Sequence, residues 1–234
     1  MDAFLDFFAE WGEQLYETFI EDDRYMLLVD GLKNTVIITL GALLLGVIIG
    51  TLIAVIKYFA EDVNLLKPFA KVCDVYVTVV RGIPVTVLLL IFFFVILTEA
   101  DGIITAIITF GINSGAYMAE LIRSGINAVD SGQMEAGRSL GMSKLQTMYK
   151  IIFPQAIRYI LPAIGNELIA LLKETSVAGY VAVQDLTRGG NLIRNNTYDA
   201  VNPLMVVALT YLAIVIVLTW ALGKVERSLN RDKR

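Results

Sequence analysis

Residues 135–167 read EAGRSLGMSKLQTMYKIIFPQAIRYILPAIGNE, and this stretch decides how the rest of the chain is interpreted. It is a polar segment between two strongly apolar regions, and charges such as Glu135 and Arg138 would be costly inside hydrocarbon. Its apolar residues recur near helical spacing, so a helix here keeps one apolar face. Gly141 is suited to end a first short helix and Ser143 to cap a second. The pattern predicts two short amphipathic helices outside the bilayer, with a surface on which a partner docks.

The rest of the sequence has the composition of an integral membrane protein. Of its 234 residues, 56% are hydrophobic and only 18% are charged, and the mean hydropathy is +0.67. A single cysteine, Cys73, excludes an internal disulfide and a multi-cysteine metal site. The absence of histidine excludes triads and zinc sites built on that residue. We therefore expect no catalytic residue, no cofactor site and no metal site in this chain.

Apolar runs on both sides of the segment predict an all-α membrane protein with five transmembrane helices. Each run approaches or exceeds the roughly 20 residues that a helix needs to cross a bilayer. The expected spans are about residues 32–56, 69–97, 102–123, 156–183 and 203–222. The expected domains are an interfacial segment (1–29), a membrane domain (30–226) that includes a polar loop (126–154), and a basic tail (227–234).

Small residues recur at close-packing intervals in two of these spans. Rows of this kind allow the backbones of two helices to approach each other in lipid, so we interpret them as packing rather than chemistry. They are Ala42, Gly46, Gly50 and Ala54 in the first span and Gly111, Gly115 and Ala119 in the third.

The second span carries the sequence Arg81-Gly82-Ile83-Pro84 near its middle. Pro84 cannot donate to the helix ladder, so we expect one kinked helix over 69–97, with these residues as a gate or kink. Arginine at such a depth is expensive unless it faces protein or water. Arg81 therefore either lines the inner mouth of a pathway or reaches back to the membrane surface.

The N-terminal segment is acidic and is not a signal peptide, because it has no basic start. Nine of the 23 acidic residues lie within residues 1–30. Aromatic and aliphatic residues nevertheless mark one helical face, which predicts an amphipathic helix that lies on the membrane surface or against the first span. The alternative is a segment that is disordered when free. The residues on that face are Phe4, Phe8, Trp11, Leu15 and Phe19.

The distribution of lysine and arginine predicts the orientation of the chain. These residues gather after the first and third spans and in the tail, and few lie on the other side. The expected topology therefore has the N-terminus outside, with the C-terminus and the loop at 126–154 in the cytoplasm. The basic residues on the expected inner side include Lys57, Lys67, Lys71, Arg138, Lys144, Lys150 and the tail residues, against mainly Arg24, Arg188 and Arg194 outside.

Polar residues inside the third and fourth spans are candidates for a substrate path. Polar groups on one face of a membrane helix usually turn inward, and Asn113, Tyr117 and Glu120 share such a face. Either Glu120 or Glu167 is suited to meet an ammonium group or a basic side chain. The alternative for each residue is an ordinary interhelical hydrogen bond. The full candidate set is Asn113, Tyr117, Glu120, Glu167, Thr175 and Ser176.

No phosphate-binding loop of the form G-x-x-x-x-G-K-[ST] occurs in the sequence. This chain therefore does not bind and hydrolyse ATP through such a loop. If transport is driven by ATP, a separate subunit must supply hydrolysis, with Mg-ATP bound in that subunit. The segment at 135–154 is the best candidate for its attachment.

That segment resembles the cytoplasmic loop of permease subunits of ATP-driven importers. The family pattern is E-A-A, three residues, G, nine residues, I, one residue and L-P. This sequence matches it at Glu135, Ala136, Gly141, Ile151 and Pro154, but has glycine at 137 and phenylalanine at 153. The resemblance implies that the loop couples to an ATPase; the alternative is a loop that merely bridges two spans. The coupling residues that it implies are Glu135, Ala136, Gly137, Ser139, Leu140, Gly141 and Met142.

Other stretches are similar to the polar amino-acid branch of type I ABC importers. They are Gly31–Thr35, Arg81–Pro84, Asn113–Tyr117 and Lys173–Ser176, and the likeness covers most of residues 30–225. It implies a five-helix permease fold with cytoplasmic coupling helices in a bacterial cell membrane, forming half of a translocation pathway. It also implies a second permease subunit, two copies of a cytoplasmic ABC ATPase and an extracytoplasmic amino-acid-binding protein. The acidic N-terminal helix is not explained by the likeness.

Two other functions remain open on sequence grounds. An ion-coupled secondary amino-acid transporter often shows inverted repeats, and we see none here. A structural membrane subunit is also possible, whereas a membrane enzyme lacks any motif in its favour. We expect lipid but no nucleic acid as a partner. The second permease is either a copy of this chain or a sister subunit, and the binding protein is either free or tethered.

Overall fold

The computed structural model describes residues 2–230, with side chains described for residues 10–229, and no strand occurs in that part of the chain. Short 3₁₀ and π-helical turns connect or extend several of the helices. The α-helices are α1 (Asp2–Phe19), α2 (Tyr25–Ala60), α3 (Lys67–Gly82), α4 (Val85–Ile91), α5 (Gly102–Asn127), α6 (Gly132–Ser139), α7 (Lys144–Thr147), α8 (Phe153–Glu174), α9 (Leu186–Thr197) and α10 (Asn202–Asn230).

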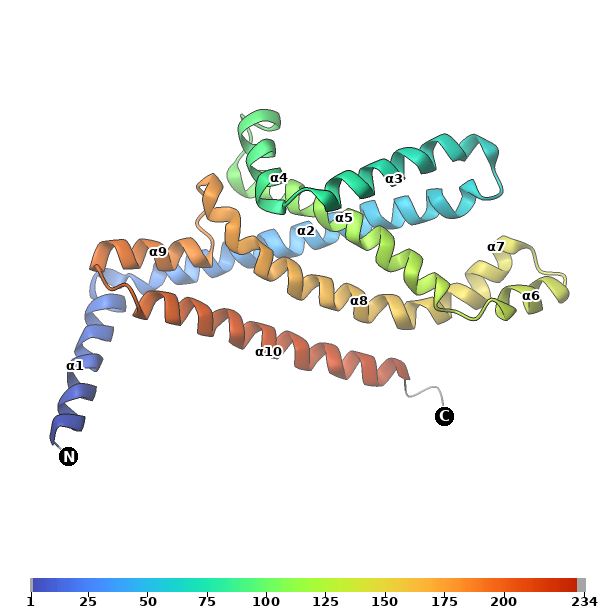
Figure 1. Cartoon of the computed structure of the whole chain (residues 1–234). Coiled ribbons are helices and arrows are strands. Elements are labelled where there is room, and N and C mark those ends of the chain that lie inside the picture. Colours follow the sequence, from blue (N-terminus) through green and yellow to red (C-terminus); the bar gives the residue numbers. More distant parts are fainter. Residues whose placement is uncertain (1, 231–234) are drawn as a thin grey trace.

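The long helices α2, α5, α8 and α10 share one general direction, and α3 lies against α2 and α5 (Figure 1). Four of the remaining helices lie at opposite ends of this bundle, whereas the short helix α4 lies near its middle (Figure 1). Helices α1 and α9 lie at one end, and α6 and α7 lie at the other (Figure 1). These two ends are called the α9 end and the elbow end below, the elbow being the segment 132–147 that contains α6 and α7.

The most extensive helix pair, α2 against α5, is built on the two rows of small residues. A side-chain carbon added at Gly46 would lie 2.7 Å from the Ser114 hydroxyl oxygen, and one added at Gly115 would lie 2.7 Å from Ile49. Both distances are shorter than van der Waals contact, so only glycine fits. The predicted close-packing role of these rows is confirmed.

Three helices are long and apolar enough to cross a membrane within the described chain: α2 with the turn before it, α5 and α10. Helix α2 is longer than the predicted span 32–56 and passes through the expected boundary at residue 30. Helix α8 has 22 residues, which corresponds to about 33 Å at 1.5 Å per residue. Because of its polar residues, α8 is not among the three helices that are apolar enough to count as spans. It packs against α2, α5 and α10.

The fourth predicted span was wrong at its far end. The α-helix stops at Glu174 instead of continuing to residue 183, and residues 175–181 form a tighter 3₁₀ helix. The Thr175 hydroxyl donates to the Leu172 carbonyl oxygen at 2.7 Å. Ala182 then adopts a left-handed conformation with φ of 61°, which ends the helical run.

The second predicted span is broken rather than kinked. Its two halves, Asn64–Gly82 and Val85–Ile96, meet at 105°. Ile83 is extended, with φ of −102° and ψ of 131°, as the residue before a proline is expected to be. Pro84 therefore marks the right place, but the chain turns sharply there and α4 leaves the direction of α3 (Figure 1).

The N-terminal segment forms a helix, α1, that leaves the bundle at the α9 end (Figure 1). Trp11 donates its indole N–H to Asn202 at 3.2 Å, and the Thr18 hydroxyl donates to the Asp199 carboxylate at 3.1 Å. These contacts tie α1 to the chain around the start of α10. The side chains of Phe4 and Phe8, and the tail from residue 231 onward, lie outside the described residues.

Candidate coupling surface and substrate clefts

The first helix of the elbow ends in a Schellman motif. Gly141 has a φ of +81°, the left-handed conformation that glycine adopts without strain. The Met142 N–H donates to the Gly137 carbonyl oxygen at 3.1 Å, and the Gly141 N–H donates to the Arg138 carbonyl oxygen at 3.0 Å. The prediction that Gly141 ends this helix is confirmed.

The second helix of the elbow begins with a complete capping box. The Gln146 N–H donates to the Ser143 hydroxyl at 3.2 Å, and the Ser143 N–H donates to the Gln146 side-chain oxygen at 2.9 Å. The prediction that Ser143 caps this helix is therefore confirmed. Pro154 follows shortly after the π-helical turn Met148–Ile152, and the helical backbone continues through it into α8.

The inner side of the elbow is tightly packed, whereas its outer side is exposed. Gly137 leaves no room for a side chain against Thr147, which is fully buried. Leu140, by contrast, is 81% exposed, and Leu145 and Tyr149 are also exposed. A rigid, capped elbow with uncovered apolar side chains is suited to docking. Of the seven sequence candidates, Gly137 is buried and Met142 is partly buried, whereas Glu135, Ala136, Ser139, Leu140 and Gly141 are exposed.

One lysine ties the elbow to the turn between α2 and α3. The Lys144 ammonium lies 2.8 Å from the Asp62 carboxylate, 3.3 Å from that of Glu61 and 4.9 Å from the centre of the Tyr58 ring. The hydrogen bond to Asp62 raises the pKa of Lys144 above its usual range. From the sequence, Lys144 was only one of the basic residues expected on the inner side of the membrane. Its link to Asp62 was not predicted, because the two residues are about 80 positions apart in the sequence.

A charged cleft lies between α2, α3 and α5, toward the elbow end, with a volume of about 570 Å³. The Lys57 ammonium lies 2.7 Å from Asp74 and 3.8 Å from Glu120, which also binds Arg123 at 2.7 Å. The Arg81 guanidinium lies over the Tyr117 ring, 5.0 Å from its centre. The polar residues of this inner cleft are Lys57, Asp74, Thr78, Arg81, Tyr117 and Glu120.

The structure brings together only part of the predicted substrate path. Tyr117 and Glu120 share the inner cleft with Arg81. Pro84 lies between α3 and α4, in the turn that follows the cleft residue Gly82. Asn113 is buried in the bundle and does not line this cleft. Glu167 accepts a hydrogen bond from the Ser114 hydroxyl at 2.9 Å, a link between α8 and α5.

Two cleft residues were missed as site candidates. Lys57 is a lysine near the end of a long apolar helix, and Asp74 is a carboxylate in the first half of the broken span. Both charges interrupt apolar sequence, which is the signal that would have identified them.

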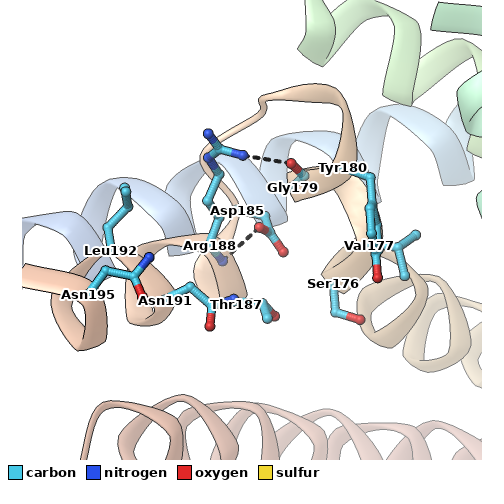
Figure 2. Close-up of a pocket in the computed structure, with 10 residues that line it drawn as sticks. All are labelled: Ser176, Val177, Gly179, Tyr180, Asp185, Thr187, Arg188, Asn191, Leu192 and Asn195. Atoms are coloured by element: carbon cyan, nitrogen blue, oxygen red, sulfur yellow. Dashed lines mark hydrogen bonds between the residues drawn. The ribbon is translucent and has the colours of Figure 1, made fainter. Parts of the chain in front are cut away.

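A second hollow, the outer pocket, lies at the α9 end and has a volume of about 510 Å³ (Figure 2). Asp185 caps α9 by accepting the Arg188 backbone N–H at 2.9 Å, and the Arg188 guanidinium donates to the Gly179 carbonyl oxygen at 2.7 Å. Ser176, a predicted path residue, lines this pocket, whereas Thr175 is buried. The polar lining residues are Ser176, Asp185, Thr187, Arg188, Asn191 and Asn195.

Helix α9 is held firmly against the first turns of α2. The Asn34 amide donates to the Gln184 carbonyl oxygen at 2.9 Å, and the Leu186 N–H donates to the Thr35 hydroxyl at 3.1 Å. A side chain at Gly31 would collide with the Asp185 backbone. The sequence between the fourth and fifth spans shows turn formers but no apolar run, so this helix and its charged residues were not expected. Asp185 directly before Leu186 is the capping signal that pointed to it.

A helical membrane bundle with a rigid elbow at one end and charged clefts within it defines a transport subunit. The sequence match to the family described as "Binding-protein-dependent transport system inner membrane component" covers residues 42–231. The chain belongs to this family, and it is therefore the membrane permease subunit of an ABC importer. It is a multi-pass membrane protein with the type I importer permease fold.

The alignments with similar proteins extend over nearly the full length of this chain and of each relative. The arginine transport system permease protein ArtQ of Bacillus subtilis is 34% identical over 209 residues, which cover 88% of this chain and 93% of that protein. A putative glutamine transport system permease protein, GlnP, of Rickettsia typhi is 33% identical over 210 residues, covering 88% and 94%.

Solved structures agree with the fold. The crystal structure of an amino acid ABC transporter with histidines has a TM-score of 0.81 at 36% identity, covering 90% of this chain and 98% of that one. The inward-facing methionine transporter MetNI has a TM-score of 0.74 at 22% identity, covering 88% and 97%. The second likeness concerns the fold alone.

Proposed function

We propose that this permease imports an amino acid and that the inner cleft is part of its path. The single observation that carries the proposal is the pairing of opposite charges there: Arg81 and Lys57 face Glu120 and Asp74 across one hollow. An amino acid needs a partner for its carboxylate and another for its ammonium group, and such a cleft offers both. Relatives named as arginine and glutamine permeases support the substrate class.

The proposed orientation has the elbow end in the cytoplasm and the α9 end outside. It is supported by the excess of lysine and arginine on the elbow side. Two copies of a cytoplasmic ATPase bind Mg-ATP and dock on the elbows of two permease subunits. A binding protein delivers the amino acid from the outside. The chain itself carries no phosphate-binding loop, which supports a separate ATPase.

In this mechanism, closure of the ATPase pair moves the elbows as rigid bodies. The Schellman motif, the capping box and the Gly137–Thr147 contact make the elbow stiff enough to transmit force. Lys144 passes the motion to the end of α2, which carries Lys57 into or out of the inner cleft. ATP drives the cycle only because it favours one of the two packings of the subunits.

Within the cleft, Arg81 and Glu120 are the residues proposed to meet the substrate. Glu120 already pairs with Lys57 and Arg123, and the Arg81 guanidinium lies over the Tyr117 ring. An arriving amino acid exchanges these contacts for its own carboxylate and ammonium group. Glu167 instead joins α8 to α5 through the Ser114 hydroxyl, whereas the Thr175 hydroxyl bonds to Leu172 at the end of its own helix and Asn113 is buried in the bundle.

Uptake into vesicles containing the permease, the ATPase and the binding protein tests the proposal. Uptake of an amino acid from a panel that includes arginine and glutamine should require ATP. Glu120→Gln should lower it at least tenfold, whereas Glu99→Gln, a carboxylate outside the cleft, should leave it unchanged. Uptake that survives ATP depletion but collapses with the proton gradient would instead support a secondary transporter.

A further inference from the structure

The outer pocket contains two opposite charges that do not neutralise each other. No ion pair joins the Asp185 and Arg188 side chains among the described residues. Figure 2 shows the Asp185 carboxylate facing the space beside Ser176 and Val177, while the Arg188 guanidinium turns up toward Gly179. Asp185 is the N-cap of α9 and Arg188 lies in its first turn, so one rigid element sets their spacing.

Asp185 is buried, and one of its oxygens has no partner. The residue is buried in the wall of the pocket, its Oδ1 accepts the Arg188 N–H, and its Oδ2 makes no hydrogen bond within the described residues. A buried acceptor without a donor is costly, and a native structure keeps one only with a reason. In this pocket, the missing partner of Oδ2 would be a cationic or N–H group of a ligand that enters from outside.

Arg188 has bonding capacity to spare on the same wall. Of its five N–H donors, one is engaged by the Gly179 carbonyl oxygen at 2.7 Å. That bond fixes the guanidinium plane at the rim and leaves further donors for an anion. Asn191 and Asn195, one and two turns along α9, continue the polar lining.

We propose that the outer pocket is a receiving site for a zwitterionic amino acid, with Asp185 binding its ammonium group and Arg188 its carboxylate. The volume of about 510 Å³ lies within the range of roughly 300–1,000 Å³ typical of small-molecule sites. Because both contacts go to groups that every amino acid shares, the site recognises the class, and Asn191 and Asn195 face the variable side chain. The inference rests on the proposed amino-acid substrate and adds a stage before the inner cleft.

A cysteine-protection experiment on the purified permease–ATPase complex tests this site. Asn191→Cys is placed in a Cys73→Ser background, which otherwise contains no cysteine, and its reaction rate with a small maleimide is measured. Millimolar L-arginine or L-glutamine, whichever the complex transports, should slow the reaction at least threefold. The N-acetyl and carboxamide derivatives of the same amino acid should not slow it, because each lacks one charge.

Variants assign the protection to the two charges. Asp185→Asn or Arg188→Gln in the same background should abolish it, while Arg194→Gln, an arginine on α9 outside the pocket, should retain it. Asn195→Cys is the second reporter if Asn191→Cys impairs uptake. Labelling that is equal with and without the amino acid, in a complex that transports it, overturns the receiving site but leaves the proposed function intact. Absence of labelling under both conditions means that a second subunit fills the pocket and also overturns it.

Discussion

The Lys144 ammonium nitrogen lies 2.8 Å from a carboxylate oxygen of Asp62, although 81 residues separate the two in the sequence. This contact joins the elbow to the turn that follows α2. Because both side chains are partly exposed, the pair contributes only about 1 kcal/mol or less to stability. Its importance is therefore geometric: it links the docking surface to the helix that carries Lys57.

We predict that reversing this charge uncouples the transporter without unfolding it. Lys144→Glu should repel Asp62 and Glu61, so uptake per ATP hydrolysed should fall several-fold while the melting temperature changes little. Asp62→Lys added to Lys144→Glu should restore much of the lost coupling. Uptake and ATP hydrolysis measured on the same vesicles provide the ratio, and an unchanged ratio in the single variant would remove Lys144 from the mechanism.

A second prediction concerns the turn of the elbow. Gly141→Ala places a side chain at a φ of +81°, which costs on the order of 1–2 kcal/mol. The elbow should loosen, with lower uptake, and Gly141→Pro should uncouple ATP hydrolysis from uptake altogether. Gly12→Ala, on an open face of α1, is the matched control and should be neutral or slightly stabilising. Normal uptake in the Gly141→Pro variant would contradict the coupling role.

The contact between α2 and α5 should tolerate no added volume. Gly46→Leu forces a side chain against Ser114 and Gly115, and overpacking of this kind costs about 1–3 kcal/mol. Gly223→Leu, whose nearest neighbouring atom is 3.8 Å away on Arg227, should cost much less. The test compares the melting temperatures of the two variants in detergent, and the loss should be larger for Gly46→Leu. Equal losses would mean that the small-residue rows are not the packing core.

The capped Asp185 should make stability depend on pH. Burial raises the pKa of Asp185 from 3.8 to about 6, opposed in part by the Arg188 backbone N–H. Between about pH 6 and 3.8 the folded state thus binds a proton that the unfolded state lacks. The contribution of Asp185 to the free energy of unfolding therefore rises as the pH falls through 6. The melting-temperature difference between wild type and Asp185→Asn should shift in favour of wild type from pH 7 to pH 5, and a constant difference would contradict this.

Local features of this fold were predictable because they depend on neighbouring residues. Gly141 and Ser143 carry their own turn and cap signals, and both were recognised. Pro84 was placed correctly, but the 105° angle between α3 and α4 depends on how α4 packs against α5, which no local pattern records. The end of α8 at Glu174 was missed because the sequence beyond it remains apolar.

The candidate sites were predicted only in part, for the same reason. Tyr117 and Glu120 lie on one helix face, and they do share a cleft with Arg81. The partners from other helices, Lys57 and Asp74, were not expected, since their meeting depends on tertiary packing. Helix α9 had a capping signal at Asp185, but its Gly189-Gly190 pair lowers helix propensity and hid the helix that holds the outer pocket.

Cross-linking from Leu140 tests the central claim that the elbow is the surface on which the ATPase docks. Leu140→Cys in the Cys73→Ser background presents a side chain that is 81% exposed, and Thr147→Cys, at a fully buried position of the same elbow, is the control. A short bifunctional reagent should join Leu140→Cys, but not Thr147→Cys, to the ATPase in the assembled complex. A Leu140→Cys that stays free of the ATPase and reacts with a membrane-impermeant maleimide added outside intact cells would contradict it.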